Sequence, residues 1–332
     1  MSASTTDVVL LPSNRPPERF YRGGAGIARF RGEPDAGERV PEDWVASTTT
    51  LAGEARLGLT TLPDGRTLAA AVAQQPERWL GPEHVAAFGA DTRLLVKLLD
   101  AGERLPVHAH PDDAFAARTL GRAHGKAEAW YLLSGGEIHL GLEHELPRAE
   151  LEALVAAQDT EALLARLHRR RVDAGDVVFV PPGVLHAIGA GILLVELQQP
   201  EDLSILVEWR DFALDGARDG HLGLGFDVAL DAIELRARSA AELDELVRPA
   251  GEGGSVLPAA SNRYFRLEHR IGPDPVLEPG FAVVVVLRGA FRLGDDGPAL
   301  PAGSTALVPW SAGPARLVGD GEVLVCRPPA PR

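Results

Sequence analysis

Short runs of valine, isoleucine and leucine recur along the chain, and glycine or proline separates most of them. Several runs alternate between apolar and polar side chains with a period of two, which is typical of strands with one buried face. Closely spaced turn residues favour antiparallel hairpins over the long crossovers of a parallel sheet. The clearest predicted strands cover residues 94–99, 129–133, 137–142, 177–181, 192–198, 203–209, 282–287 and 322–326. The pattern predicts a mainly β protein, an antiparallel sandwich or barrel.

Three segments follow the helical period instead. Segment 67–79 begins with a threonine that can cap a helix, and segment 146–168 carries leucine and valine at helical spacing with a proline near its start. The third segment covers 239–246. We expect these segments to be helical inserts in a β protein.

One stretch separates the chain into two parts. Residues 248–262 are dominated by glycine, serine, alanine and proline and show no periodicity, which is typical of a linker. We therefore predict an N-terminal domain over 1–247 and a smaller C-terminal β domain over 263–332.

Composition and charge exclude several classes of function. The 332 residues are 45% hydrophobic and 24% charged, which is typical of a globular protein. No apolar run reaches the roughly 18 residues that span a membrane. The N-terminus lacks a basic start followed by an apolar stretch, so we expect that the protein is not secreted. A formal charge of −14 disfavours binding to nucleic acid or to an acidic membrane. The only cysteine, Cys326, excludes an intrachain disulfide, and we expect a cytoplasmic protein.

Four residues have the types and spacing of a metal site. His108 and His110 are two positions apart, so on a strand both imidazoles point to the same face. Glu128 follows at a distance, and His186 closes a Gly-x5-Pro-x-Gly-x2-His block that begins at Gly175. With Gly102 and Gly135, these spacings resemble the two halves of the cupin motif, Gly-x5-His-x-His with Glu-x6-Gly and the block above.

The ligand set determines which ions are expected. Three neutral imidazoles and one carboxylate suit one divalent metal ion and leave room for a substrate or water. Zinc, manganese, iron, cobalt and nickel all remain possible on these donors. The resemblance implies a jelly-roll β-barrel for the metal-binding domain.

A longer resemblance explains the wide gap between His110 and Glu128. The chain is similar to the class I mannose-6-phosphate isomerases, cupins that split the first half of the motif with an insert and place a Lys-x-Glu segment after it. The segments that carry this resemblance are 19–26, 42–47, 64–68, 94–116, 125–133, 180–188 and 196–204. They cover roughly residues 20–240, and the C-terminal part resembles the family's metal-free half-cupin.

The resemblance implies roles for individual residues. His110, Glu128 and His186 match three family zinc ligands, so the resemblance makes zinc the first expectation. His108 stands where the family usually has glutamine. Lys126 matches the family lysine beside the metal-binding glutamate, which suggests proton transfer or contact with substrate oxygens. The implied reaction interconverts mannose 6-phosphate and fructose 6-phosphate through a cis-enediol.

Other positions match the family's substrate side. Trp44, Ser47, Lys97 and Asp202 are expected to bind the substrate, a sugar or sugar phosphate. In place of the family's His-Pro and phosphate loop, Ser47 is followed by the hydroxyl-bearing residues 48–50. Asp112 and Asp113 either orient a metal ligand or form a turn after Pro111.

The family's arginine is missing. Its position is occupied by Leu206, which cannot stabilise a negatively charged enediolate. On a strand over 203–212, Glu208 and Arg210 share the face of Leu206, so both are candidate catalytic residues. This departure leaves two alternatives open, an isomerase of an unphosphorylated or sulfonated hexose and a sugar-binding cupin without turnover. A third alternative is a cupin oxygenase, because three histidines and one glutamate also suit Fe(II).

The C-terminal part contains a second hairpin without histidine over 301–313, for which we expect no metal. Trp310 and the run 283–287 are expected in a core or an interface. A homodimer is an open alternative for the assembly.

Overall fold

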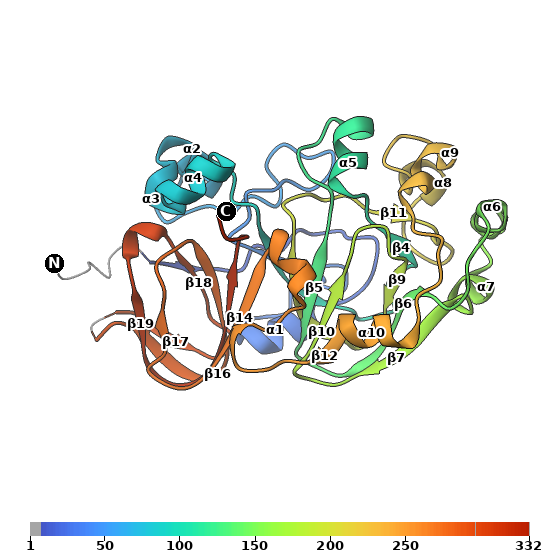
Figure 1. Cartoon of the computed structure of the whole chain (residues 1–332). Helices are drawn as coiled ribbons and strands as arrows, with labels where there is room; N and C mark the ends of the chain where they lie inside the picture. The colour runs from blue at the N-terminus through green and yellow to red at the C-terminus, as the bar shows by residue number, and fades with distance from the viewer. Residues whose placement is uncertain (1–7, 296, 332) are drawn as a thin grey trace.

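The computed structural model describes residues 8–295 and 297–331. Its named strands pair antiparallel, and they form three sheets of which none is closed into a barrel within the described residues. The prediction of a mainly β protein is therefore confirmed, and the expected jelly roll is an open one. Figure 1 shows the C-terminal sheet, in orange and red, beside the sheets of the N-terminal part.

The six-stranded sheet, in the order β12, β8, β5, β10, β3 and β2, consists of Val247–Pro249, Asp176–Val180, Glu128–Leu132, Leu193–Gln198, Leu95–Asp100 and Glu42–Val45. The five-stranded sheet, in the order β11, β4, β9, β6 and β7, consists of Ile205–Leu206, His108–Ala109, His186–Ile188, Gly136–Leu142 and Leu167–Val172. The main path of the eight-stranded sheet is, in order, β1 (Val9–Leu11), β18 (Thr305–Val308), β16 (Ala282–Leu293), β19 (Ala315–Arg327), β14 (Arg266–Pro273) and β13 (Gly253–Ser255). Two short strands lie off this path: β15 (Val276–Leu277) pairs with β19, and β17 (Ala299–Pro301) pairs with β16.

The helices are short. The α-helices α1 to α10 are Ala25–Arg31, Leu68–Gln74, Pro76–Leu80, Pro82–Phe88, Asp113–Phe115, Arg148–Ala157, Thr160–Leu164, Gly216–Asp219, Phe226–Ala229 and Ala240–Leu246. The π-helix η2 is Ala116–Leu120, and the 3-10 helices η3, η4 and η5 are Leu230–Ala232, Ala259–Arg263 and Trp310–Ala312. No helix among the described residues is long and apolar enough to cross a membrane.

The predicted helical inserts are present, but two of them are broken. Thr67 caps α2 by accepting a hydrogen bond from the Ala70 amide, as its position predicts, and Pro76 then starts α3. The predicted insert 146–168 contains α6 and α7, separated at Gln158, whose φ is 50°. α10 begins at a capping box in which Ser239 and Glu242 bond to each other's backbone amides.

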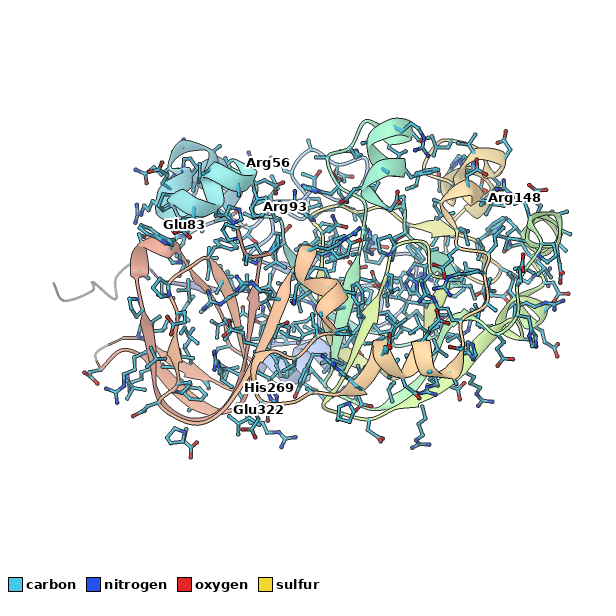
Figure 2. The ribbon with its side chains drawn as sticks, viewed as in Figure 1. Arg56, Glu83, Arg93, Arg148, His269 and Glu322 are labelled. Atoms are coloured by element: carbon cyan, nitrogen blue, oxygen red, sulfur yellow. The ribbon has the colours of Figure 1, made fainter. Side chains whose placement is uncertain are left out.

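The six-stranded sheet has two differently used faces. Glu128 and Trp130 on β5 point toward the five-stranded sheet, where Glu128 meets His110 and His186. Tyr131 points the other way, because successive side chains of a strand alternate. Its hydroxyl donates to Glu322 on β19 at 2.9 Å, and His269 on β14 lies 2.7 Å from the same carboxylate. Figure 2 shows His269 and Glu322 together near the lower edge of the C-terminal sheet.

The hydrophobic core crosses from the N-terminal part to the C-terminal sheet. Val178 and Leu194 of the six-stranded sheet belong to the same buried cluster as Leu267 and Leu324 of the C-terminal sheet. A second cluster lies under the five-stranded sheet with α6 and α7, and a third covers the other face of the C-terminal sheet. Because both faces of β16 are covered, its first residues are continuously apolar, as 282–287 is in the sequence.

The linker predicted over 248–262 is not a free connection. β12 pairs with β8 in the six-stranded sheet, and β13 pairs with β14 in the C-terminal sheet, so the chain passes between sheets in the few residues between them. β1 also pairs with β18, which places residues 9–11 in the C-terminal sheet and not with the rest of the predicted domain 1–247. The domain boundaries themselves stay a prediction.

Candidate metal centre

The four predicted metal ligands meet between the two sheets of the N-terminal part. His108 on β4 lies directly opposite His186 on β9, and His110 follows two positions later on the same face. Glu128 reaches them from β5 of the facing sheet. One ligand atom from each of the four buried side chains lies within 4.8 Å of all the others. The spacing of the motif therefore places the residues as expected.

Each imidazole is held in one orientation by the backbone. The Nδ1 atoms of His108, His110 and His186 lie 2.8, 2.7 and 2.9 Å from the carbonyl oxygens of Pro106, Leu203 and Val184. A carbonyl oxygen only accepts, so each Nδ1 carries the proton and each Nε2 presents a lone pair to the centre. This arrangement orients neutral imidazoles as metal ligands.

The electrostatics of the cluster favour the metal-binding protonation states. Burial, with the neighbouring histidine His186, lowers the pKa of His108 well below its usual value, and burial with Lys126 lowers the pKa of His110 to about 4. Burial alone would raise the pKa of Glu128, but Lys126 and the histidines hold it well below its usual value. These shifts favour neutral imidazoles at His108 and His110 and an ionised carboxylate at Glu128.

Three of these buried atoms have no hydrogen-bond partner: Nε2 of His110, Nε2 of His186 and Oε2 of Glu128. The two Nε2 atoms nevertheless lie 2.9 and 3.1 Å from the carboxylate oxygens of Glu128. Lone pairs held this close to an anion are stabilised by a cation between them. The donor set therefore fits a divalent metal ion.

Lys126 lies beside the cluster. Its Nζ is 3.0 Å from Glu128 Oε2, and its side chain is 6% exposed. The backbone amide of Lys126 donates to Pro111 O at 2.9 Å, which fixes the end of the insert against its start. The insert between His110 and Glu128 thereby delivers the lysine to the metal centre.

Asp112 and Asp113 stabilise that insert. Asp112 caps α5 by accepting from the Phe115 amide at 2.7 Å. Asp113 accepts from the Gly125 amide and from Gln199 Nε2, both at 2.8 Å. Of the two interpretations given for these aspartates, the structure supports the turn.

A cavity opens beside the cluster. Its wall contains metal ligands, cations, carboxylates and apolar residues from seven strands and the loops around them. The lining residues are Arg19, Phe20, Tyr21, Glu42, Lys97, Leu99, Leu105, Pro106, His108, Lys126, Glu128, Ile188, Glu196, Asp202, Ser204 and Leu206. Lys97, Lys126 and Asp202 were predicted at the site, and Leu206 is in the wall.

Charged residues form a row across the inner face of the six-stranded sheet. Glu128 lies on β5, Glu196 on β10, Lys97 on β3 and Glu42 on β2, and Glu196 pairs directly with Lys97 in the strand register. The Lys97 ammonium lies 3.4 Å from Glu42 and 3.5 Å from Glu196. These side chains are almost completely buried, so their charges interact strongly.

Glu196 is a titratable group that the motif comparison missed. Burial, together with the negative charge of Glu128, raises its pKa to about 7, although Lys97 and Lys126 act in the opposite direction. Its Oε2 has no hydrogen-bond partner. A charged residue inside the apolar run 192–198 was the signal that could have found it, as Lys97 in 94–99 also shows.

Trp44 and Ser47 do not line this cavity. Trp44 is fully buried, donates from Nε1 to Glu42 Oε2 at 2.7 Å and places its ring 4.7 Å from Lys97 Nζ. Ser47 is also buried, and its hydroxyl donates to Thr49 O at 3.0 Å. Trp44 therefore supports Glu42 and Lys97 from behind the wall. Thr48, Thr49 and Thr50 line a second cavity, which shares Asp202 with the first.

The predicted positions of Glu208 and Arg210 need correction. β11 ends at Leu206, because its pairing with β4 ends there, so the alternation assumed for a strand over 203–212 does not continue. Glu208 is buried in an ion pair with Arg104, and Arg210 is exposed and donates to Ala157 O at 2.8 Å. Neither residue lines the cavity.

Solved structures identify the fold. The chain superimposes on the mannose 6-phosphate isomerase from Bacillus subtilis with a TM-score of 0.75 and 22% identity, over 96% of this chain and 99% of that one. The apo mannose 6-phosphate isomerase from Salmonella typhimurium gives 0.74 and 12%, over 99% and 100% of the two chains. The protein has the fold of the phosphomannose isomerases, which confirms the predicted cupin fold.

The amino-acid sequence is also similar to those of curated relatives. A mannose-6-phosphate isomerase from Streptococcus mutans is 41% identical over 132 residues, 38% of this chain and 40% of that protein. The Bacillus subtilis protein named "Probable mannose-6-phosphate isomerase GmuF" is 28% identical over 243 residues, 71% of this chain and 75% of its own length. No family model matches the chain. The predicted resemblance to the class I mannose-6-phosphate isomerases is confirmed by these relatives and by the fold.

Proposed function

We propose that this protein is a metal-dependent aldose–ketose isomerase that interconverts mannose 6-phosphate and fructose 6-phosphate through a cis-enediol. The observation that carries the proposal is that the candidate metal ligands His108 and Glu128 line the same cavity as Lys126 and Glu196. The reaction needs a group that polarises two neighbouring oxygens and a group that moves a carbon-bound proton, and this cavity offers both. The relatives named mannose-6-phosphate isomerase support the same substrate.

A divalent ion at His108, His110, Glu128 and His186 would polarise the oxygens at C1 and C2 of the sugar. We take zinc as the resident ion because imidazole and carboxylate are its usual ligands, and the same donors also suit manganese, iron, cobalt and nickel. The compartment we propose is the cytosol, as expected from the single cysteine.

The protein's own groups act on protons around this position. The Lys126 ammonium, 3.0 Å from Glu128, donates hydrogen bonds to the substrate oxygens as negative charge develops on them. Glu196 takes the proton from C2 and returns it to C1, because a carboxyl group with a pKa of about 7 can both accept and release a proton near neutral pH. In the same conversion the proton of the C2 hydroxyl passes to the C1 oxygen.

Substitution of Glu196 tests its part. Glu196→Gln keeps the shape of the side chain but cannot accept the proton, so we expect kcat to fall roughly 10²- to 10⁴-fold. Metal content should stay the same, because Glu196 is not a ligand. Glu137→Gln, at an exposed carboxylate paired with Arg169, is the matched control. A Glu196→Gln enzyme with wild-type exchange of the C2 proton would remove Glu196 from the mechanism.

Proton NMR in D2O tests the function as a whole. Metal-reconstituted protein is mixed with mannose 6-phosphate, and the C2 proton signal and the signals of fructose 6-phosphate are followed. Ketose formation with deuterium uptake is the expected result. Protein with confirmed metal that shows neither would reject mannose 6-phosphate as substrate, and the same assay with unphosphorylated and sulfonated hexoses would separate a different isomerase from a sugar-binding cupin.

A further inference from the structure

Arg19 contributes a cation to the cavity at a distance from the metal ligands. Its side chain is 12% exposed, and its Nε donates to Glu42 Oε1 at 2.8 Å. Among the described residues, its terminal Nη atoms make no hydrogen bond, although Arg19 lines the cavity. The guanidinium group therefore presents free N–H donors to whatever enters.

Glu42 holds this arginine in place. It accepts from the Tyr21 hydroxyl at 2.6 Å and from Trp44 Nε1 at 2.7 Å, in addition to Arg19 Nε. The Lys97 ammonium lies 3.4 Å from its second oxygen. With both oxygens occupied by donors, Glu42 is a fixed anion that orients the two cations beside it.

The backbone before Arg19 is also constrained. Glu18 has a φ of 56°, in the left-handed region that non-glycine residues rarely adopt. The next amide, that of Arg19, donates to Arg39 O at 3.0 Å. A strained residue is maintained only where its surroundings over-determine the backbone, and here the result is the position of Arg19.

The strand order separates Arg19 from the metal ligands. Glu128 lies on β5 and Glu42 on β2, with β10 and β3 between them. At a strand spacing of about 4.8 Å, the two ends of the row are roughly 14 Å apart. A six-carbon substrate with its C1 and C2 oxygens at the metal ligands extends along this row toward Arg19.

From this geometry we infer that Arg19 is a substrate-binding residue and Glu42 its positioning residue. The Nη atoms of Arg19 donate hydrogen bonds to oxygen atoms at the end of the substrate remote from the reacting carbons, either a phosphate group or a terminal hydroxyl. The inference rests on the proposed function for the direction in which the sugar lies.

Binding of sugar alcohols tests this inference without turnover, because they lack the carbonyl group. The probes are glucitol 6-phosphate and glucitol, titrated into metal-loaded protein by calorimetry. Arg19→Gln should weaken the binding of at least one probe roughly 10- to 100-fold, the effect of losing hydrogen bonds to a charged donor. Arg19→Lys should bind with intermediate affinity, because it keeps the charge and loses the planar donor pair. Arg169→Gln, an exposed arginine paired with Glu137, is the control.

The two probes distinguish the two oxygen sources. A loss confined to glucitol 6-phosphate assigns the phosphate to Arg19, and an equal loss for both probes assigns a hydroxyl. Glu42→Gln should reproduce the Arg19→Gln loss, and the double variant should bind no more weakly than Arg19→Gln alone, as for two residues that act as a unit. Wild-type affinities in Arg19→Gln, or a wild-type protein that binds neither probe, overturn the inference.

The outcomes also separate this inference from the proposed function. Turnover of mannose 6-phosphate with unchanged binding in Arg19→Gln leaves the isomerase and rejects the role of Arg19. Arg19-dependent binding without any turnover would support the role of Arg19 and reject the isomerase.

Discussion

The imidazoles of the metal centre owe their orientation to backbone carbonyls. Because each Nδ1 proton is bound to a carbonyl oxygen, the Nε2 lone pairs face the centre without rotation of the rings. The site is therefore preorganised for a metal ion, and an ion that binds to the folded state stabilises it.

Removal of one ligand should therefore abolish metal binding without unfolding the chain. His186→Ala should reduce the metal content, measured by elemental mass spectrometry after desalting, from one ion per chain to a small fraction. The same variant should lose the rise in melting temperature that metal gives the wild type. His139→Ala, at a histidine outside the cluster, should keep both. Full metal occupancy in His186→Ala would contradict the assignment of the site.

Glu42 gives the folded chain a pH-dependent part of its stability. Burial opposes ionisation of Glu42, but Arg19 and Lys97 lower its pKa far below the usual 4.5. A carboxyl group with a lowered pKa stabilises the folded state above its unfolded pKa, and this contribution is lost as the pH falls toward the folded pKa. The ionised form is thus the stabilising one at neutral pH.

Glu42→Gln should accordingly lower the free energy of unfolding by roughly 3–5 kcal/mol at pH 7, because it leaves Arg19 and Lys97 buried with fewer partners. The difference between variant and wild type should shrink as the pH is lowered below about 4.5. Urea unfolding at pH 7 and at pH 4 measures both values. A difference that is constant or grows toward acid would refute the assigned direction of the pKa shift.

The spacing of the motif predicted the four candidate metal ligands, which the structure brings together, and the resemblance to the family added Lys126. Spacing was insufficient for Arg19, Glu42 and Glu196, whose roles depend on the lateral order of strands that are distant in the sequence. Glu208 and Arg210 were placed wrongly because the extent of β11 is set by its pairing with β4.

At the scale of elements, the helices α2 to α4 dock onto the C-terminal sheet. α3 contacts η5, and Trp310 of η5 packs on Gly81 between α3 and α4. Figure 1 shows this helical group above the C-terminal sheet. The segment predicted as an insert therefore connects the two parts of the molecule.

Gly81→Ala should weaken this contact. A Cβ at Gly81 would lie 2.5 Å from Trp310 Cδ1, and the φ of 91° is itself unfavourable for alanine. We expect a loss of roughly 1–3 kcal/mol in urea unfolding from the overpacked contact alone. Gly175→Ala is the matched control, since its φ is 90° and no atom lies within 4 Å of the added Cβ. Equal losses in the two variants would mean that the backbone, and not Trp310, causes the effect.

The breaks in the helical segments show why element boundaries are harder to predict than elements. Pro76 ends one helix and begins the next, and both readings are compatible with its chemistry. Gln158 adopts the left-handed conformation, and its side-chain Nε2 donates hydrogen bonds to Val155 O and to Val207 O. The second contact comes from a segment far along the chain, so no local pattern contains it.

At the scale of the whole molecule, the N-terminal part and the C-terminal sheet share a hydrophobic core and a polar contact at Glu322. Tyr131 and His269 both meet Glu322, and the apolar cluster around them is continuous. Because the core is common, we expect the two parts to unfold together.

Calorimetry of the Glu322→Ala variant tests this coupling. The variant leaves Tyr131 and His269 without their shared acceptor and should lose roughly 1–3 kcal/mol of stability in a single transition. Arg288→Ala removes a partner of the same carboxylate that is 81% exposed and 3.5 Å away, so it should change little. Two separate transitions, of which only one responds to metal, would show that the parts are independent.

The pairing of β1 with β18 determines when the C-terminal sheet can be completed. Residues 9–11 are synthesised well before residues 305–308, yet they are neighbours in one sheet. During synthesis the metal-binding sheets can assemble while β1 has no partner, and an unpaired strand is prone to join a strand of another chain. The strand β1 thus stays an open edge until residues 305–308 have been synthesised.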